Sequence, residues 1–510
     1  MSRRYRVFAL LLALCLLTGC TASIPIKEGA GVTLPPVELP YDAPDGDAAE
    51  SAAQTVLLCL PAAKTGQLEY FPEKVLLSPS RHPAELTLRR LFTYAGTTQA
   101  SPLGGGVQLA LNPGSAIEIS GDTATVNLAP SALSLNNQER YVISRAIANT
   151  LTQWGDIRYV NVLINSRQLG LDTASTIPLS SLGKTEDGDV IALYDSLSQS
   201  AARQDSAYTA MATLYYPVSA GRGIAGQSRL ITANSRSLPD MAYALLEALS
   251  TRGDVPAGTP VVPDLTTLLQ GPITVDENAG ATGRIVKLVF AESMNEALIA
   301  SGITRSVMMA ALTYTLTTFL PYTSGISVTI GTEQIGALVP AGLYDGAGEQ
   351  ILFTNGIMQR SQFSHFLLDH CALYFANAEG SLTKTLRAIP YHQMHNPRYI
   401  MNQLMKGPQN TDSVTGLTPV LPQDLTDADL LGITIQNETA LANFSGRLRE
   451  KSAQMTREQE LLMVYAMVNT LTKIRTAKQA CFFIDGKQEG TFVSSIDLVG
   501  VFLRNVGIIQ

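Results

Sequence analysis

The sequence has little charge and few aromatic residues. Of its 510 residues, 15% are charged, 6% are aromatic and one is a tryptophan. Nucleic-acid-binding proteins usually carry a basic face, whereas this chain has a formal net charge of −7. We therefore expect no nucleic-acid partner. The hydrophobic content of 45% is typical of a globular protein, and the length exceeds that of one ordinary hydrophobic core, which predicts about three domains.

Long hydrophobic runs are missing except at the start of the chain, MSRRYRVFALLLALCLLTGC. Three arginines precede the apolar run 7–17, which is shorter than the roughly 20 residues that a membrane-spanning helix needs. The run ends in Leu17-Thr18-Gly19-Cys20, which resembles the bacterial lipobox. The resemblance implies cleavage before Cys20 and a diacylglycerol on its sulfur; an uncleaved hydrophobic N-terminus is the alternative. We expect an extracytoplasmic lipoprotein bound to the cell membrane.

Cysteine is also scarce. Cys15 lies in the predicted signal peptide and Cys20 is the predicted lipid site, which leaves Cys59, Cys371 and Cys481. An odd number without close spacing predicts buried free thiols, although one disulfide between two of them stays open because the compartment permits it. Removal of residues 1–19 takes away three arginines and changes the net charge to −10. Charge does not attract such a chain to anionic lipid, so the lipid anchor must hold it there.

No string of residues predicts an enzyme. Ser181 and Lys184 fit S-x-x-K, Lys64 begins a K-T-G, and Ser134 and Asn136 fit S-x-N, the three motifs of penicillin-binding enzymes. Here they run in the reverse order, and S-x-x-K does not begin a helix beneath a large sheet. We predict no catalytic residue and no cofactor.

The histidines do not form a metal-binding pattern. His365 and His370 are five residues apart, which would separate them by about 140° on a helix. His82, and His392 with His395, come shortly before prolines, which is typical of loops and helix caps. We predict no metal site. Trp154 and Asp156 follow a predicted helix, where they form either a contact point or the closure of a core edge.

What the sequence does contain is a repeated phrase. Residues 149–170 read NTLTQWGDIRYVNVLINSRQLG and residues 469–490 read NTLTKIRTAKQACFFIDGKQEG; a third copy at 314–336 needs one extra residue. Apolar residues recur at helical spacing before each copy and β-branched or aromatic residues follow. Asn136 with Glu139, and Thr456 with Gln459, predict capping boxes at the two helix starts. The phrase is therefore a helix end, a turn and a strand.

The repeated unit extends further towards the N-terminus. Strands are predicted at 55–61, 211–217 and 371–377, and Pro83, Pro239 and Pro397 each begin a helical pattern. Two strands then precede the helix of the phrase. The predicted fold is α+β, with three tandem β-α-β-β-α-β repeats, each a small sheet with two helices on one face. The predicted domains are a signal peptide (1–19), a lipidated tether (20–52), repeats at 53–185, 209–340 and 369–510, and linkers at 186–208 and 341–368. Apolar helical stretches in both linkers, VIALYDSLSQSAA and SQFSHFLLDH, predict that the linkers pack against the repeats.

The stretch LNPGSAIEISGDTATVNLAPS, the helix ending Asn-Thr-Leu-Thr and the strand VLINSRQLG are similar to the GerMN domain of bacterial sporulation and spore-germination lipoproteins. The similarity is good at about 56–172 and 372–492 and weak in the middle copy. It implies a fold related to ring-building motifs and a non-enzymatic role in envelope assembly, sporulation or germination. Three copies depart from the one or two usual in the family.

Two functional hypotheses follow from these observations. The first is a lipid-anchored scaffold that binds envelope or sporulation proteins, peptidoglycan or further copies of itself through strand edges and helix faces. The second is a monomeric lipoprotein that binds a small ligand or glycan in a cleft between repeats, where pockets are common.

Overall fold

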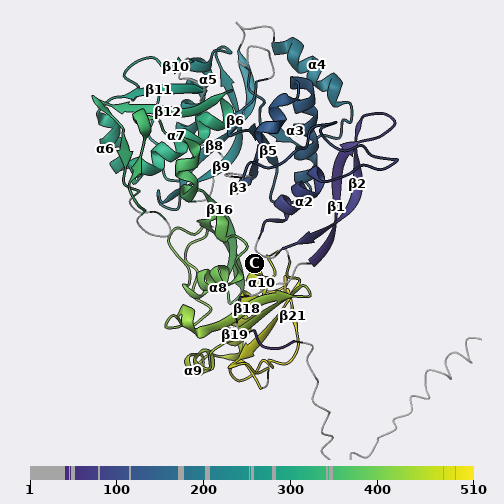
Figure 1. Cartoon of the computed structure of the whole chain (residues 1–510). Helices are drawn as coiled ribbons and strands as arrows, with labels where there is room; N and C mark the ends of the chain where they lie inside the picture. The colour runs from purple at the N-terminus through teal and green to yellow at the C-terminus, as the bar shows by residue number, and fades with distance from the viewer. Residues whose placement is uncertain are drawn as a thin grey trace, which may run out of the picture. The chain divides into compact units, whose positions relative to one another are not determined.

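A hairpin, two or three helices and a second sheet make up each of three stretches of the computed structural model (Figure 1). The structure describes residues 41–44, 46–47, 52–78, 81–113, 117–170, 177–201, 207–251, 253, 255, 258–277, 283–340, 343, 348–474, 476–488 and 490–510. We call residues 52–185 the first stretch, 208–340 the middle stretch and 368–510 the last stretch. The predicted signal peptide and Cys20 lie outside the described residues.

The first stretch has two separate sheets, and helix α3 contacts both of them. Its elements are β1 (Ala52–Pro61), β2 (Leu68–Leu77), α2 (Pro83–Phe92), β3 (Ile117–Ser120), β4 (Thr123–Leu128), α3 (Asn137–Leu151), β5 (Tyr159–Ile164), β6 (Arg167–Gln168) and β7 (Leu182–Gly183). β1 and β2 form an antiparallel hairpin. β3, β4 and β5 form a separate sheet in which β4 and β5 run parallel, because α3 carries the chain back between them. Contacts join α3 to both β1 and β5.

The middle stretch has the same order of main elements, with an additional helix, α6, before the second long helix. These are β8 (Tyr208–Val218), β9 (Gly223–Ala233), α5 (Leu238–Ser250), β10 (Thr274–Asp276), β11 (Arg284–Phe290), α6 (Ser293–Ala300), α7 (Arg305–Phe319), β12 (Thr323–Ile330) and β13 (Glu333–Gln334). β8 pairs with β9, and the sheet order is β10-β11-β12-β13, with β11 and β12 parallel.

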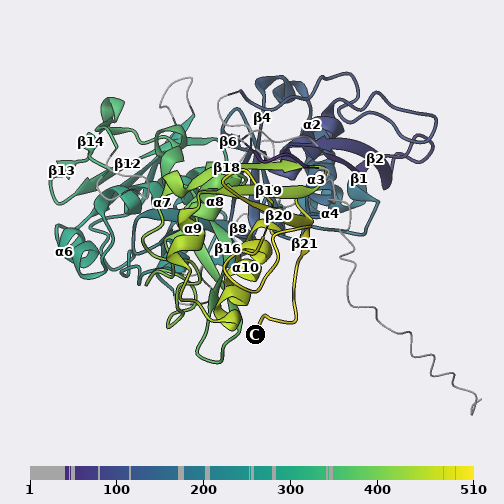
Figure 2. The same cartoon turned by 90° about the horizontal axis from the view of Figure 1, so that it is seen from below.

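The last stretch continues this pattern. Its elements are β16 (Leu368–Ala376), β17 (Leu382–Pro390), α8 (Pro397–Met405), β18 (Leu430–Gln436), β19 (Thr439–Phe444), α9 (Arg447–Lys451), α10 (Arg457–Leu471), β20 (Gln479–Ile484) and β21 (Phe502–Leu503). The sheet order is β18-β19-β20-β21, and Figure 2 shows these strands side by side. The remaining described elements include one α-helix, α4 (Val190–Ala201), the short strands β14 (Ala337–Leu338) and β15 (Ile351–Leu352), and 3₁₀ turns such as η1 (Pro130–Ser134).

The local signals at the helix starts are confirmed. Both capping boxes are present: Asn136 bonds reciprocally with Glu139, and Thr456 with Gln459. Pro83, Pro239 and Pro397 all lie at the first positions of their helices. These interactions span three residues or fewer, so the sequence alone is enough to predict them.

The mixed α+β class is confirmed, but the predicted strand order is incomplete. Each stretch opens with two paired strands instead of one, and the hairpin forms a sheet of its own, apart from the strands that follow. β2 contains Pro72, and β9 contains Gly223 and Gly226, which weaken a strand signal. They still form strands because β2 pairs with β1, and β9 with β8, along their whole length.

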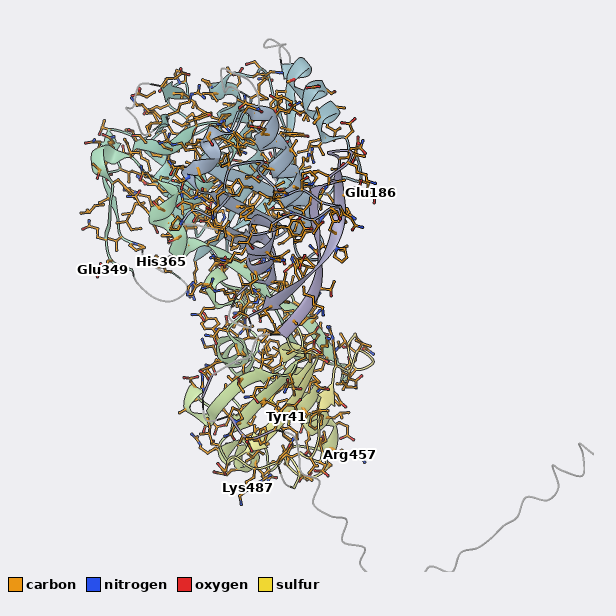
Figure 3. The ribbon with its side chains drawn as sticks, turned by 45° about the vertical axis from the view of Figure 1, so that its right-hand side comes forward. Tyr41, Glu186, Glu349, His365, Arg457 and Lys487 are labelled. Carbon is orange, nitrogen blue, oxygen red and sulfur yellow. The ribbon has the colours of Figure 1, made fainter. Side chains whose placement is uncertain are left out.

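The linker 341–368 also differs from its prediction. Residues 360–366 form a 3₁₀ turn, η4 (Arg360–Phe366), with non-helical backbone at Phe363, and the chain then enters β16. His365 is therefore exposed on the turn (Figure 3), whereas His370 lies on a strand. Leu368, Asp369 and His370 pair with β17, and this pairing prevents the continuous helix that the apolar pattern of SQFSHFLLDH suggested. In the linker 186–208, α4 forms as expected.

Each stretch has its own cluster of buried hydrophobic residues. One cluster runs from Val56 to Val190, a second from Ala210 to Leu367, and a third from Cys371 to Leu498. The linkers contribute to these clusters through Val190 and through Phe363 and Phe366. In the described part of the chain, no single helix has the length and hydropathy to cross a membrane; α6 and α7 meet those criteria together, with a bend of 100° between them.

Candidate functional site

The first four residues of the repeated phrase, Asn-Thr-Leu-Thr, form the C-terminal end of a helix. The second threonine of Asn-Thr-Leu-Thr donates back to a carbonyl one turn earlier: Thr152 Oγ1 to Ala148 O, and Thr472 Oγ1 to Val468 O, both at 2.8 Å. Each carbonyl also accepts the backbone N–H of the same threonine at 2.9 Å, so the hydroxyl adds a second hydrogen bond to the end of the helix. This part of the phrase is structural.

The asparagine of the phrase forms a hydrogen bond to the backbone just after the last strand of its sheet. Asn149 Oδ1 accepts a bond from Thr185 N at 2.9 Å, and Asn469 Oδ1 accepts one from Asn505 N at 3.0 Å. In both cases the donor lies 36 residues further along the chain. The middle stretch has Tyr314 at this position, so its copy of the phrase gives up this bond.

Tyr314 instead takes part in a buried polar contact with the first stretch. Its hydroxyl lies 3.4 Å from Glu118 Oε1 on β3, and Glu118 forms an ion pair with Arg360. The Arg360 guanidinium also donates to Tyr215 OH at 3.0 Å and to Thr318 Oγ1. Burial lowers the pKa of Arg360, but the charge of Glu118 outweighs it and raises that pKa above its usual value. The departure from asparagine thus marks where two stretches meet.

Buried hydroxyl and amide groups extend this interface. The outer face of β4 and β5 lies against β8 and β9, and Asn161 Nδ2 donates to Thr213 Oγ1 at 2.8 Å. Gly121 approaches Gly226 so closely that a Cβ on Gly121 would lie 2.0 Å from Gly226 O. Both contacts need small or polar residues, which explains why hydrophobic periodicity does not reveal this face. The remaining hydroxyl partners are Thr123, Thr125, Ser181 and Ser228.

The first threonine of the phrase differs among the three stretches. Thr150 Oγ1 accepts a bond from Cys59 N at 2.9 Å, and Thr315 Oγ1 accepts one from Tyr215 N at 3.0 Å. Each bond joins the phrase helix to the opening hairpin. Thr470 is fully buried, yet its Oγ1 has no hydrogen-bond partner among the described residues. A buried hydroxyl without a partner is rare and needs a reason.

Thr470 lines a cavity of about 540 Å³ where the first and last stretches meet. The wall from the first stretch is the turn after α3, with Gly155 and Asp156. The apolar lining comes from Cys371, Ala372, Met394, Ile400 and Ile474. The polar lining from the last stretch is His370, Lys384, His395, Thr470, Thr472 and Lys473.

A histidine contact joins the two stretches beside this cavity. His82 is buried, and its Nδ1 accepts a bond from Ala84 N at 3.0 Å as the cap of α2. Its Nε2 therefore carries the proton and donates to Asp156 Oδ2 at 3.1 Å. The His395 ring lies edge-on to the His82 ring, with the ring centres 5.0 Å apart. The sequence predicted a loop position for His82; in the structure His82 is the cap of α2, and His395 and Asp156 contact it.

Asp369 forms another contact between the same stretches. Its Oδ1 accepts bonds from Gly121 N at 3.2 Å and from His370 N at 2.8 Å. Burial is the main cause that raises the pKa of Asp369 to about 7, and the negative charge of Asp156 adds to the effect. The neighbouring Leu368 O accepts a bond from Ser120 Oγ. The start of β16 is therefore fixed to the β3–β4 turn.

The chain upstream of β1 lies along the last stretch. Ile433 N donates to Gly46 O at 3.2 Å, Asn443 Nδ2 donates to Pro44 O at 3.4 Å, and the Arg398 guanidinium pairs with Asp47. Gly432 leaves room for this segment, because a Cβ there would lie 2.1 Å from Pro44 O. The end of the predicted tether thus meets the last stretch before the first one begins.

The other residues singled out in the sequence have structural environments. Cys59, Cys371 and Cys481 are buried and free, as predicted. Burial raises the pKa of Cys371 to about 12 and those of Cys59 and Cys481 to about 11, so they stay as thiols. Ser181 is buried and bonds to Asn161 and Thr213, which is a structural role. Within the described residues, no group of His, Cys, Asp and Glu side chains has a metal-binding arrangement.

Sequence reasoning missed three of these functional candidates, namely Glu118 with Arg360, Asp369, and Thr470. Only the first had a signal, the replacement of asparagine by Tyr314 in the repeated phrase. The lack of a hydrogen-bond partner for Thr470 is invisible in the sequence, because Thr470 and Thr150 both lie in the same four residues, Asn-Thr-Leu-Thr.

Comparison with known proteins gives one family match, to a model described as Germane, sporulation and spore germination, at residues 372–490. The tandem GerMN domains of the sporulation protein GerM from Bacillus subtilis are 17% identical, with 59% of this chain and 99% of that chain covered and a TM-score of 0.23. A putative lipoprotein from Clostridium perfringens is 21% identical over 27% of this chain and 87% of that chain, with a TM-score of 0.19. The first GerMN domain of the same GerM is 18% identical over 26% and 96%, with a TM-score of 0.19. No curated protein matches the sequence.

Proposed function

We propose that this chain, which is a GerM-like protein through residues 372–490, is a lipid-anchored scaffold in sporulation, germination or cell-envelope assembly. It consists of three GerMN-like domains, and it acts outside the cytoplasm by binding envelope or sporulation proteins, peptidoglycan or further copies of itself. It is not an enzyme. The family match relates the chain to sporulation and germination; anchoring and binding are the further steps of the proposal.

One observation carries the scaffold role. The contacts between the stretches are buried and polar, with the Glu118–Arg360 ion pair between β3 and η4 and the Asp369 contact between β16 and the β3–β4 turn. Buried polar contacts have strict geometry and are costly when broken, so they favour one fixed arrangement. A fixed arrangement keeps several binding faces at constant separation, which is what a scaffold requires.

The lipobox-like Leu17-Thr18-Gly19-Cys20 supports the anchor. Two or more acyl chains bind a membrane stably, whereas a single chain does not. The segment 43–47 bonds to the last stretch, so the proposed tether meets that stretch first. We therefore place the last stretch next to the tether and leave the remaining surfaces for partners.

The anchor and the scaffold role need separate experiments. Cys20→Ser should move the protein from the membrane fraction to the soluble fraction of the producing cells, and a protein that stays membrane-bound would refute the anchor. For the scaffold role, the mature chain with Cys20→Ser should be studied by light scattering over a concentration series, followed by cross-linking in intact cells. A defined oligomer, or one reproducible cross-linked envelope partner, is expected. A strict monomer without any cross-linked partner would contradict the role.

A further inference from the structure

The first and middle stretches are joined at the edge of the first sheet. β7 forms part of that edge through its pairing with β5, and the preceding residue, Ser181, donates its backbone N–H to Met211 O of β8 at 2.8 Å. The Ser181 hydroxyl lies 2.9 Å from the Thr213 hydroxyl, which lies 2.9 Å from Ser228 Oγ of β9. The hairpin β8–β9 therefore covers the edge of the sheet that precedes it in the chain, and the side chains at this contact are polar. We call this contact the internal junction.

The last stretch has the same edge strand, but it is uncovered. β21 pairs with β20 in the same register as β7 with β5, counted from the start of the repeated phrase. Val501 therefore takes the place of Ser181, and Leu503 takes the place of Gly183. Ser181 is buried in the internal junction, whereas Val501 is 45% exposed and Leu503 is 66% exposed. Among the described residues, β21 pairs with β20 alone.

The first stretch has the same hairpin, and the corresponding face of that hairpin is exposed. Cys59 N and Tyr215 N bond to equivalent threonines of the phrase, which aligns β1 with β8 and puts Leu57 in the place of Thr213. Thr213 is buried in the internal junction, whereas Leu57 is 44% exposed. Pro72, which lies opposite Leu57 on β2, is exposed as well.

The side chains at these two surfaces differ from the internal junction in the same way. Where the internal junction places the hydroxyls of Ser181 and Thr213 together, the two exposed surfaces carry the aliphatic residues Val501 and Leu57. A single exposed aliphatic residue is common. Here both members of one contacting pair have become aliphatic, and one of them lies beside an edge strand, whose free side favours pairing with a further strand. The two surfaces therefore match each other.

We propose that the hairpin β1–β2 of one copy binds the β21 edge of a second copy, in the arrangement by which β8–β9 covers β7 within the chain. Leu57 packs against Val501, and the Val501 N–H donates to Thr55 O, which takes the place of Met211 O. Because the two surfaces differ, each copy uses both at once, and the copies associate head to tail. The inference rests on the proposed scaffold role and names the surfaces through which copies of the chain bind.

The first test is the self-association of the mature chain carrying Cys20→Ser, measured by light scattering over a concentration series. Leu57→Asp and Val501→Asp should each raise the Kd of self-association at least tenfold, with unchanged far-ultraviolet circular dichroism because both positions are exposed. Leu352→Asp is the matched control, at a leucine of β15 that is 68% exposed and lies outside both surfaces, and it should leave the Kd unchanged. Self-association that the two cavity-free surface variants do not weaken more than the control would overturn the proposal.

The second test traps the contact between copies. The equivalent hydroxyls of the internal junction lie 2.9 Å apart, so cysteines at the matching positions come close enough for a disulfide. A mixture of Leu57→Cys and Val501→Cys chains should form a covalent heterodimer on oxidation, whereas Leu57→Cys mixed with Leu352→Cys should not. The native Cys59, Cys371 and Cys481 are buried and do not compete.

The outcomes separate this inference from the scaffold role. A monomer at every concentration without the specific disulfide, or equal disulfide yields in the two mixtures, would overturn the head-to-tail contact. If an envelope partner is still cross-linked in cells, the scaffold role stands without that contact. If neither the contact nor a partner is found, both fail.

Discussion

The three equivalent threonines allow one substitution to be compared in three environments. Thr→Val keeps the β-branched shape and a similar helix propensity but removes the hydroxyl. In Thr150→Val, the buried Cys59 N–H loses its acceptor, and in Thr315→Val the buried Tyr215 N–H does. In Thr470→Val, no hydrogen bond between described residues is lost.

The magnitudes follow from these contacts. A buried donor left without its acceptor costs about 1–3 kcal/mol, so Thr150→Val and Thr315→Val should destabilise the protein by that amount. Thr470→Val removes a buried hydroxyl that already lacks a partner, so its effect on the free energy of unfolding should be between no change and a gain of about 1 kcal/mol.

Amide hydrogen exchange measures the loss of each of these hydrogen bonds locally. A local measurement is needed because a chain with several hydrophobic clusters need not unfold in one step. Thr150→Val should speed exchange at Cys59 N about 5- to 150-fold if exchange follows local opening, and Thr315→Val should do so at Tyr215 N. Urea unfolding gives the global comparison. If Thr470→Val destabilises the protein as much as Thr150→Val, the Thr470 hydroxyl is satisfied in solution, and the argument from its orphaned state is refuted.

Three further predictions concern the contacts between the stretches. The pKa of Asp369 is raised from 3.8 to about 7 in the folded protein, so the unfolded chain releases its proton first and stability should fall as pH rises between these values, then level off. Asp369→Asn keeps the acceptor oxygen and should remove this fall, on the order of 2 kcal/mol after solvent screening; an unchanged pH profile in urea unfolding would contradict this. Arg360→Met leaves the carboxylate of Glu118 buried without its ion-pair partner, so it should lower the free energy of unfolding in urea by about 3–5 kcal/mol. The control Arg305→Met breaks an exposed ion pair and should lower it by less than about 0.5 kcal/mol. Equal losses for the two variants would exclude a special role for the buried pair. Gly121→Ala and Gly105→Ala both place a side chain at positive φ, but only at Gly121 does the new Cβ clash with backbone. The Tm of Gly121→Ala should therefore fall further than that of Gly105→Ala. Similar Tm values would show that the close approach of Gly121 to Gly226 is not rigid.

Short-range features could be predicted from the sequence because their causes lie within a few residues. The capping boxes at Asn136 and Thr456 and the proline at the start of α8 depend on neighbours in the chain, and the structure contains all of them. The α+β class follows from the same local periodicities. The second hairpin strand was missed because Pro72 weakens the strand signal of β2, and the strand predicted at 371–377 begins earlier, at Leu368, where the apolar pattern resembled a helix.

The candidate site was beyond sequence reasoning because the residues that form it are distant in sequence. His82 and Asp156 are 74 residues apart, and Gly121 and Asp369 are 248 apart, so no local pattern brings them together. The capped helix starts, the recurrence of the phrase and the family resemblance of the last stretch can be read from the sequence, since they depend on adjacent residues. Whether Thr150 and Thr470 are bonded depends on the tertiary structure. The same four residues, Asn-Thr-Leu-Thr, acquire different roles because a hydrogen bond depends on which distant backbone amide the fold brings within reach.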